Sequence, residues 1–208
     1  VEFDVMLAGC GTPVLIHDET LSRTTDGAGE VAKTPYHALA KLSAGKSHPD
    51  EYPNEPIPTL SQAIRLARSL GLKMNLEIKP AAGYAVETAQ VVARSVLEEG
   101  VPQDALVVSS FSREALAEAA RLAPGLNFAL LAERIPADWR TWREEVGAVA
   151  MHCDADTLNA DAVSECLKAG LPVVCYTVND AQKMASLVAM GVGSVFTDSL
   201  LPGVIAGR

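Results

Sequence analysis

Apolar runs alternate with amphipathic segments along most of this 208-residue chain. Short runs rich in Val, Leu and Ala recur, and each is followed by a polar turn and then by a helical pattern. Runs without polar positions, such as Val173–Tyr176, are typical of parallel strands covered on both faces. The pattern predicts seven main strands: Val1–Leu7, Lys73–Ile78, Ala105–Ser109, Leu126–Leu131, Ala148–His152, Val173–Thr177 and Ser194–Thr197. A shorter apolar run occupies Pro13–Ile16.

Helices are predicted between these strands, with recognisable first and last residues. Thr59 followed by Gln62 matches a capping box, in which the side chain of each residue accepts a hydrogen bond from the backbone N–H of the other. Glycines at positions 71, 100, 170 and 191 follow the helical patterns and favour their ends there. The predicted helices are Leu60–Leu70, Tyr84–Glu99, Ser112–Leu122, Ala137–Glu145, Asn159–Ala169 and Asp180–Met190, followed by a short tail over Leu200–Ala206.

One long segment, residues 18–58, interrupts this alternation. It is rich in Thr, Gly, Pro and charged residues, with only a weak helical patch at Tyr36–Leu42. Loops beyond about 12–15 residues are uncommon in compact domains and are usually functional or disordered. We therefore interpret residues 1–208 as a single domain with an inserted region at about 18–58.

The alternation of strands and helices indicates an α/β fold with a parallel sheet. A doubly wound open sheet would favour a glycine-rich first turn, and no G-x-G-x-x-G follows a strand here. Polar residues instead follow several predicted strands, as they do at the rim of a (β/α)8, or TIM, barrel. They are Glu77, Lys79, Ser109, Ser110, His152, Thr177, Asn179, Thr197 and Asp198. The prediction is a barrel, and the count of seven strands suggests that its first βα unit is lacking from this chain.

Composition narrows the possible partners. The chain is 49% hydrophobic and carries a net charge of −9, so it lacks the basic surface that nucleic-acid binding requires. No apolar run approaches the ~20 residues needed to span a bilayer. The four cysteines are scattered without a C-x-x-C pair, which favours reduced thiols and a cytoplasmic location. The excess of acidic over basic residues fits an enzyme that acts on a small-molecule substrate best.

Carboxylates recur at positions where buried strands are expected. Glu2 and Asp4 are two residues apart on one strand, so their side chains share a face. Glu77 and Lys79 repeat this spacing on a second strand, which ends at Pro80. Neighbouring carboxylates repel one another unless a cation compensates them, and hard divalent cations prefer oxygen ligands. The pattern predicts a metal site, with a lysine beside it that could hold an anionic group.

A histidine follows the second apolar run. His17 and Asp18 open the long segment and precede a polar loop, Leu21–Thr25, with anion-binding character. Beside a metal and a phosphate, an imidazole can act as a general acid or base. By contrast, we expect His37 and His48 to face solvent, His152 to be structural, and Cys153–Asp156 to be a solvated loop.

Together these stretches resemble the glycerophosphodiester phosphodiesterase family. The matching blocks are E-F-D-V at residues 2–5, V-L-I-H-D-E-T-L-S-R-T-T-D-G at 14–27, I-P-T-L at 57–60 and L-E-I-K-P at 76–80. Later stretches are also similar to family signatures: Ser109–Phe111, Tyr176–Asn179, Gly191–Val192 and Phe196–Asp198.

The resemblance implies a barrel of the phospholipase-C-like phosphodiesterase type, which hydrolyses glycerophosphodiesters to glycerol 3-phosphate and an alcohol in lipid and glycerol metabolism. It implies a divalent metal, Mg²⁺ or Ca²⁺, held by Glu2, Asp4 and Glu77. It also implies acid/base catalysis by two histidines, one of which is His17, and contact of Lys79 with the phosphate. The inserted region would cover the glycerol end of the substrate.

Three departures from the family pattern leave an alternative open. The H-R-G strand with the second histidine, and the P-E-N-T helix after it, match nothing in the chain. Ala8–Gly11 replaces the usual T-x-D-G, and Tyr176 replaces a tryptophan in a predicted substrate-binding wall. The alternative is a truncated or catalytically inactive barrel that binds only metal or ligand. Phospholipase D-like and sphingomyelinase-like enzymes of the same superfamily are a further alternative, but these are typically secreted with disulfides.

Overall fold

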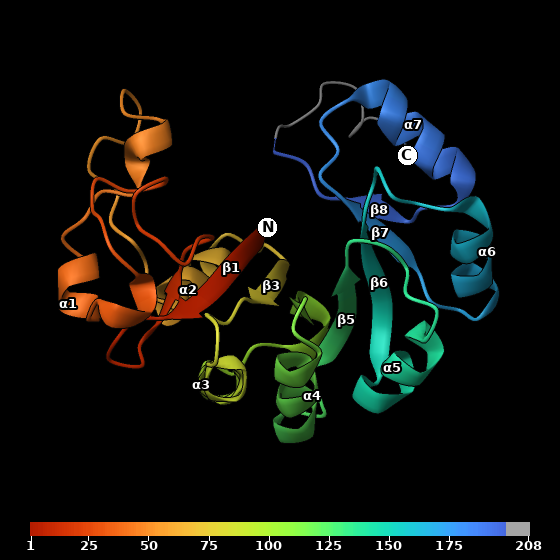
Figure 1. Cartoon of the computed structure of the whole chain (residues 1–208), viewed down its shortest axis with the longest axis horizontal. Coiled ribbons are helices and arrows are strands. Elements are labelled where there is room, and N and C mark those ends of the chain that lie inside the picture. The colour runs from red at the N-terminus through yellow and green to blue at the C-terminus, as the bar shows by residue number, and fades with distance from the viewer. Residues whose placement is uncertain (199–208) are drawn as a thin grey trace. The chain divides into compact units, whose positions relative to one another are not determined.

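A computed structural model describes residues 1–198 of the chain, which divides into two compact units, Val1–Asn127 and Phe128–Arg208. Figure 1 shows the course of the chain, with its elements labelled. The predicted tail, Leu200–Ala206, lies outside the described residues.

The first unit is built on four strands in the order β2-β1-β3-β4. Strand β1 (Glu2–Leu7) pairs in parallel with β3 (Met74–Ile78), which pairs in parallel with β4 (Leu106–Ser110). Strand β2 (Pro13–Leu15) returns antiparallel along the end of β1. This hairpin brings Ile16, the residue after β2, back alongside Asp4 in the first half of β1.

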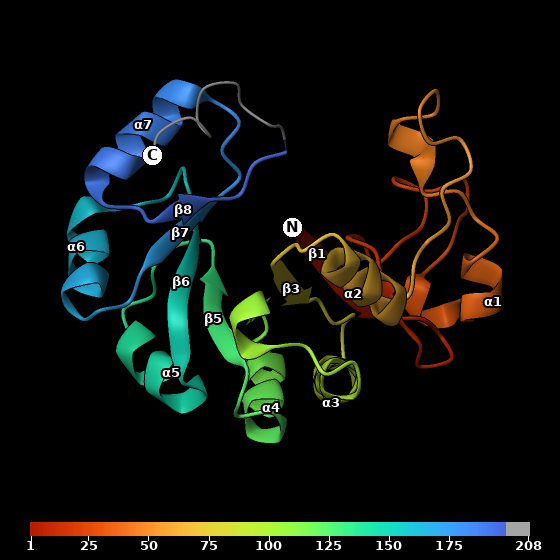
Figure 2. The ribbon, with the colours of Figure 1, turned by 180° about the vertical axis from the view of Figure 1, so that it is seen from behind.

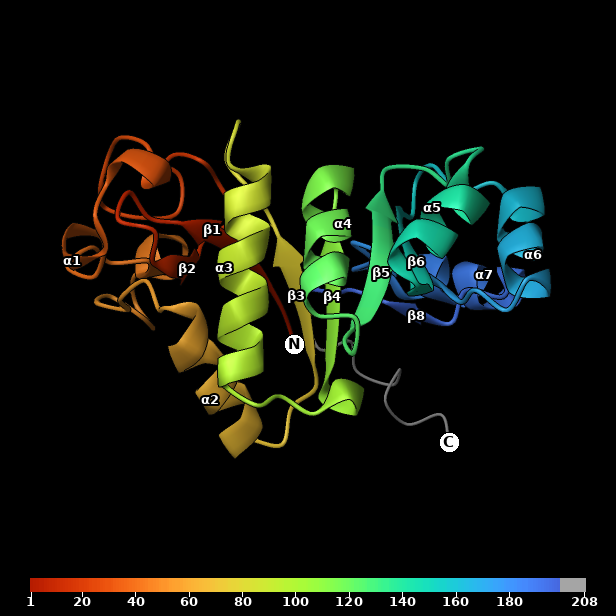
Figure 3. The same ribbon diagram turned by 90° about the horizontal axis from the view of Figure 1, so that it is seen from below.

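Three long helices belong to this unit. They are α2 (Leu60–Ser69), α3 (Ala85–Glu98) and α4 (Arg113–Leu122). The capping box predicted at the start of α2 is present: the Thr59 hydroxyl accepts from the Gln62 backbone, and the Gln62 side chain accepts from the Thr59 backbone. Figure 3 shows α3 and α4 running alongside the strands β3 and β4. Their apolar faces cover this part of the sheet.

The inserted region is ordered around a small core that it shares with the β1–β2 hairpin. It contains the short helix α1 (Tyr36–Leu39) and two 3₁₀ turns, Val31–Lys33 and Gly45–Ser47. Buried apolar side chains from β1, β2 and the insertion pack together: Met6, Ala8, Val14, Ile16, Leu21, Val31, Leu39 and Ile57. The insertion is thus anchored on the β1–β2 hairpin rather than forming a loose loop.

The second unit has four parallel strands in the order β5-β6-β7-β8, namely β5 (Asn127–Ala132), β6 (Ala148–Asp154), β7 (Val173–Tyr176) and β8 (Ser194–Val195). Helices α5 (Trp139–Val146), α6 (Ala160–Lys168) and α7 (Ala181–Met190) alternate with them. Figure 2 shows these helices on one side of their strands. Asn159 and Asp180 cap α6 and α7, and Gly191 ends α7 with a φ of 100°.

All seven predicted main strands are therefore present within residues 1–198, and their order within each unit follows the chain. Among these residues, no helix is long and apolar enough to cross a membrane. The four cysteines are free, as expected; Cys153, Cys166 and Cys175 are buried and Cys10 is exposed.

Candidate active site

Three carboxylates converge where the first half of β1 pairs with β3. The parallel register sets Glu2 opposite Asn75 and Asp4 opposite Glu77. One ligand oxygen from each of Glu2, Asp4 and Glu77 lies within 4.8 Å of the other two. The period-two spacing seen in the sequence therefore brings the expected set together, from Glu2 at the exposed end to Glu77 at the buried end.

Glu77 is the buried member of this set. Glu77 is 8% exposed, and its Oε1 atom is buried without a hydrogen-bond partner. Burial and the negative charges of Asp4 and Glu2 raise the pKa of its carboxyl to about 8, while the charge of Lys79 acts in the opposite direction. The Glu77 carboxylate therefore lies near two other negative charges, while its Oε1 atom receives no hydrogen bond.

The three residues therefore fit a divalent cation. A hard cation would supply the missing partner of Glu77 Oε1 and would relieve the repulsion among the carboxylates. Carboxylate oxygens are the donors that Mg²⁺ and Ca²⁺ favour.

Lys79 extends from the end of β3 toward the same group. Its Nζ atom donates a hydrogen bond to Asp4 Oδ1 at 3.2 Å. The lysine side chain is 25% exposed, so the ammonium group is partly desolvated but still accessible. It places one positive charge beside the carboxylates, where an anionic substrate group would need it.

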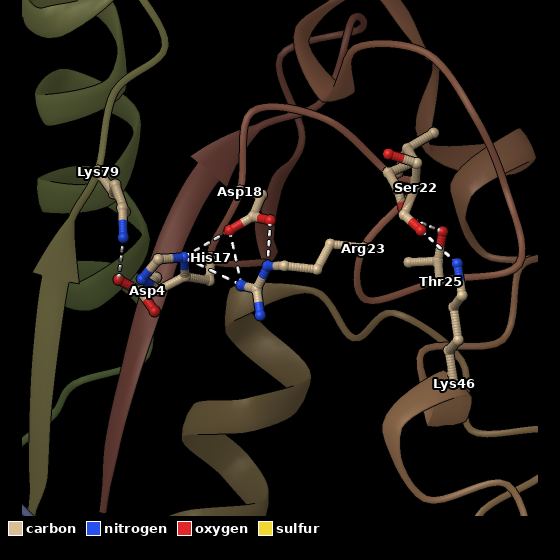
Figure 4. A network of polar contacts seen from close by, with 9 residues as sticks. Asp4, His17, Asp18, Ser22, Arg23, Thr25, Lys46 and Lys79 are labelled. Carbon is tan, nitrogen blue, oxygen red and sulfur yellow. Dashed lines mark hydrogen bonds and ion pairs between the residues drawn. The ribbon is translucent and has the colours of Figure 1, made fainter.

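His17 lies close to this group because of the β1–β2 hairpin. The backbone N–H of Ile16, the residue before it, donates to the carbonyl oxygen of Asp4 at 3.1 Å. The imidazole Nδ1 atom lies 2.6 Å from Asp18 Oδ1. Figure 4 shows the His17 ring between the Asp18 carboxylate and the Asp4–Lys79 pair.

Arg23 completes the contacts around Asp18. It donates from Nε to Asp18 Oδ2 at 2.5 Å and from Nη2 to Asp18 Oδ1 at 2.7 Å. This two-point pairing, with help from His17, holds the pKa of the Asp18 carboxyl well below its usual range. The hydrogen bonds and charge of Asp18 raise the pKa of Arg23, and the charge of Asp4 adds to this in the same direction. The sequence predicted an anion-binding loop here, and the anion that its arginine binds in the structure is Asp18.

The loop that carries Arg23 is tied to the insertion. Thr25 is buried, and its hydroxyl donates to the Leu21 carbonyl at 2.7 Å and accepts from the Gly27 N–H at 3.0 Å. The Lys46 ammonium group donates to the Ser22 carbonyl from a 3₁₀ turn of the insertion (Figure 4). These bonds fix the path of residues 21–27.

One polar residue of this face was missed at the sequence level. Asn75 donates from Nδ2 to Ser109 Oγ at 3.1 Å, and its buried Oδ1 atom has no partner. Counting back two residues from Glu77 would have placed Asn75 on the same face. It therefore extends the polar face toward the start of β3, where Asn75 lies opposite Glu2.

The other candidates lie in the insertion or in the second unit. His37 and His48 are exposed in the insertion, as expected. Tyr176 ends β7 in the second unit, where its hydroxyl donates to the Ala132 carbonyl at 3.0 Å, so its contact with substrate stays a prediction. His152 is 4% exposed in β6 and packs edge-on against Phe196, with 5.2 Å between ring centroids.

Comparison with known proteins identifies the family of the chain. The sequence profile of the glycerophosphoryl diester phosphodiesterase family matches residues 1–201. A glycerophosphodiester phosphodiesterase from Caldanaerobacter subterraneus subsp. tengcongensis is 28% identical over 95% of this chain and 81% of its own length. The protein YqiK of Bacillus subtilis is 30% identical over 95% of this chain and 82% of its own length.

Solved structures give the same result. A phosphodiesterase from Oleispira antarctica, in complex with the product sn-glycerol 3-phosphate, superposes with a TM-score of 0.91 at 38% identity, over 95% of this chain and 80% of its own. A glycerophosphodiester phosphodiesterase of Thermotoga maritima shares the fold, with a TM-score of 0.72 at 22% identity, over 95% of this chain and 80% of its own. The predicted barrel-type α/β fold is thus confirmed. The chain belongs to the glycerophosphoryl diester phosphodiesterase family, a family of phosphodiester-cleaving enzymes.

Proposed function

We propose that this protein hydrolyses glycerophosphodiesters to sn-glycerol 3-phosphate and an alcohol with the help of a divalent cation. The observation that carries the proposal is the convergence of Glu2, Asp4 and Glu77 within 4.8 Å, with Lys79 hydrogen-bonded to the same cluster. The product bound to the Oleispira relative supports the substrate class.

Glu2, Asp4 and Glu77 would hold the cation, Mg²⁺ or Ca²⁺. When bound, it neutralises phosphate charge and lowers the pKa of a hydroxyl group that it contacts. The three carboxylates would balance the charge of the cation and fix its position. Because the Glu77 carboxyl has a pKa of about 8 when no cation compensates it, we expect cation binding to displace a proton near neutral pH.

Lys79 would bind the phosphate as a point charge. Its ammonium group is held beside Asp4 and is partly desolvated, which strengthens its attraction for an anion relative to a lysine in water. Arg23 is less suited to this role because two of its donors are already bonded to Asp18.

His17 would transfer protons as a general acid or base. Its side chain is 58% exposed, so a substrate can reach it. An imidazole takes up and releases protons near neutral pH, which suits it to protonate a leaving alcohol or to accept a proton from an attacking hydroxyl.

Two further parts of the proposal concern the substrate's outer portions. The ordered insertion, residues 18–58, would cover the glycerol end. Tyr176 would form an aromatic wall for the rest of the substrate. A cytoplasmic location is proposed with these features, on the basis of the four scattered cysteines alone.

The proposal is tested with the natural full-length protein, stripped of metal with a chelator. Release of sn-glycerol 3-phosphate from glycerophosphocholine is measured before and after Mg²⁺ or Ca²⁺ is added. We expect activity to return with at least one cation and to be lost in Glu77→Ala. Glu98→Ala, which removes an exposed carboxylate at the end of α3, serves as the matched control. Equal activity in the chelated and cation-loaded protein would refute the metal requirement, and no release under any condition would refute the activity.

A further inference from the structure

The Nδ1 side of the His17 ring is occupied by a carboxylate that is itself held in place. Asp18 Oδ1 lies 2.6 Å from Nδ1, and Arg23 donates hydrogen bonds to both oxygens of Asp18. We propose that Asp18 and Arg23 are positioning residues that keep His17 in its Nδ1–H form and leave Nε2 free for proton transfer. This inference rests on the proposed acid/base function of His17.

The proton assignment follows from the chemistry of the three groups. An ionised carboxylate only accepts hydrogen bonds and a guanidinium only donates them. If Nδ1 carried a lone pair, that lone pair would face the Asp18 oxygen at 2.6 Å, which is repulsive. Arg23 Nη2 lies 3.3 Å from Nδ1, but it already donates to Asp18 at the shorter distance of 2.7 Å. The short contact with Asp18 therefore requires a proton on Nδ1.

The second consequence concerns the orientation of the ring. His17 is 58% exposed, so packing alone leaves its side chain free to rotate. The polar contacts recorded for the ring within residues 1–198 are those with Asp18 and Arg23. Holding Nδ1 against Asp18 turns Nε2 to the opposite side of the ring, which lies toward Asp4 and Lys79 in Figure 4.

Arg23 has a distinct task in this arrangement. Asp18 is next to His17 in the chain, and without a second anchor its carboxylate could turn to solvent. The guanidinium fork fixes both carboxylate oxygens, a geometry that lysine cannot reproduce. It also keeps Asp18 ionised, which preserves the acceptor that His17 needs.

The tautomer can be measured directly. The chain has only four histidines, so ¹⁵N NMR of the imidazole groups is tractable, and His17→Gln identifies the signal of interest. We expect His17, when neutral, to carry its proton on Nδ1 in the natural protein. Asp18→Asn should convert the signal to the Nε2–H form or to a mixture, because an amide nitrogen can donate to Nδ1. An Nε2–H signal in the natural protein would overturn the inference.

Kinetics supply the second arm. Asp18→Asn should lower kcat for glycerophosphocholine by roughly 10²-fold or more while KM changes little, since general acid/base catalysis is typically worth about 10²–10⁴. Arg23→Lys, which keeps the positive charge, should lower kcat less than Arg23→Gln, which removes it. The matched control is Glu99→Gln, which breaks the similar two-point pair between Arg65 and Glu99 and should leave kcat unchanged.

The two arms separate the possible failures. If the natural protein releases no product, the proposed function is wrong, but NMR still reports whether Asp18 sets the tautomer. If the protein is active and Asp18→Asn keeps both kcat and the Nδ1–H signal, the positioning role is wrong. Circular dichroism confirms that each variant is folded, and Arg23→Lys tests the same unit should Asp18→Asn not fold.

Discussion

The ammonium group of Lys79, the residue that follows β3, lies 3.2 Å from Oδ1 of Asp4 on β1. One positive charge is thereby shared among three carboxylates that lie within 4.8 Å of one another. The site is therefore short of positive charge, and its lysine competes with a cation for Asp4 while attracting an anionic substrate.

Lys79→Met should separate these two effects. Removing the ammonium group should raise KM for glycerophosphodiesters by roughly 10–100-fold, since hydrogen bonds to charged groups contribute about 1.5–3 kcal/mol. The same change should tighten divalent cation binding, because a competing positive charge near Asp4 and Glu77 is gone. Calorimetric titration with Mg²⁺ or Ca²⁺ measures the second effect. Lys79→Arg keeps the charge and should not tighten cation binding, and weaker cation binding in Lys79→Met would contradict this account.

Glu77 should make the metal-free protein less stable as pH rises. Its carboxyl has a pKa of about 8 in the folded state, against 4.5 for the ordinary group. Between these values the folded protein binds the extra proton, so the free energy of unfolding falls with rising pH, by at most ~1.4 kcal/mol per pH unit. Urea unfolding in chelator at pH 5 and pH 8 measures this difference. In Glu77→Gln the difference should shrink, whereas an equal slope in both proteins would exclude Glu77 as its source.

His152 should have the opposite pH dependence. Burial lowers its pKa to about 4, from an ordinary value of 6.5. The unfolded chain therefore takes up a proton between pH 6.5 and pH 4 that the folded protein does not, and stability should fall as pH falls through this range. His152→Leu should remove part of this acid sensitivity in urea unfolding. His37→Gln, at an exposed position, should not change it.

The capping box of α2 should contribute measurably to stability. Thr59→Ala removes the hydroxyl that accepts from the Gln62 N–H and should lower the free energy of unfolding by about 0.5–2 kcal/mol. Thr59→Ser keeps the hydroxyl and should recover most of the loss. Thermal or urea unfolding provides the measurement, and equal losses in the two variants would assign the effect to packing of the threonine methyl group instead.

Much of the fold was accessible from local pattern. Strand β7 is a continuous apolar run, and β4 and β6 open with apolar runs before their polar ends. A strand of this kind between helices with clear start and stop signals has few other stable conformations. The helix starts at Thr59, Ser112 and Asn159 were predictable for the same reason, because capping is a contact between residues two or three apart. The pairing of Glu2 with Asp4 and of Glu77 with Lys79 on shared faces needed only the period of a strand.

The sequence by itself thus determined the elements, their order, and which polar residues share a face. Only the tertiary structure decided which faces meet: the β1–β3 register that sets Asp4 opposite Glu77, and the hairpin that returns His17 to Asp4. It also decided that Arg23 binds Asp18 and that the insertion shares a core with the β1–β2 hairpin. These features depend on contacts between distant residues, whose pairing is set by the packing of the whole unit and not by any local preference.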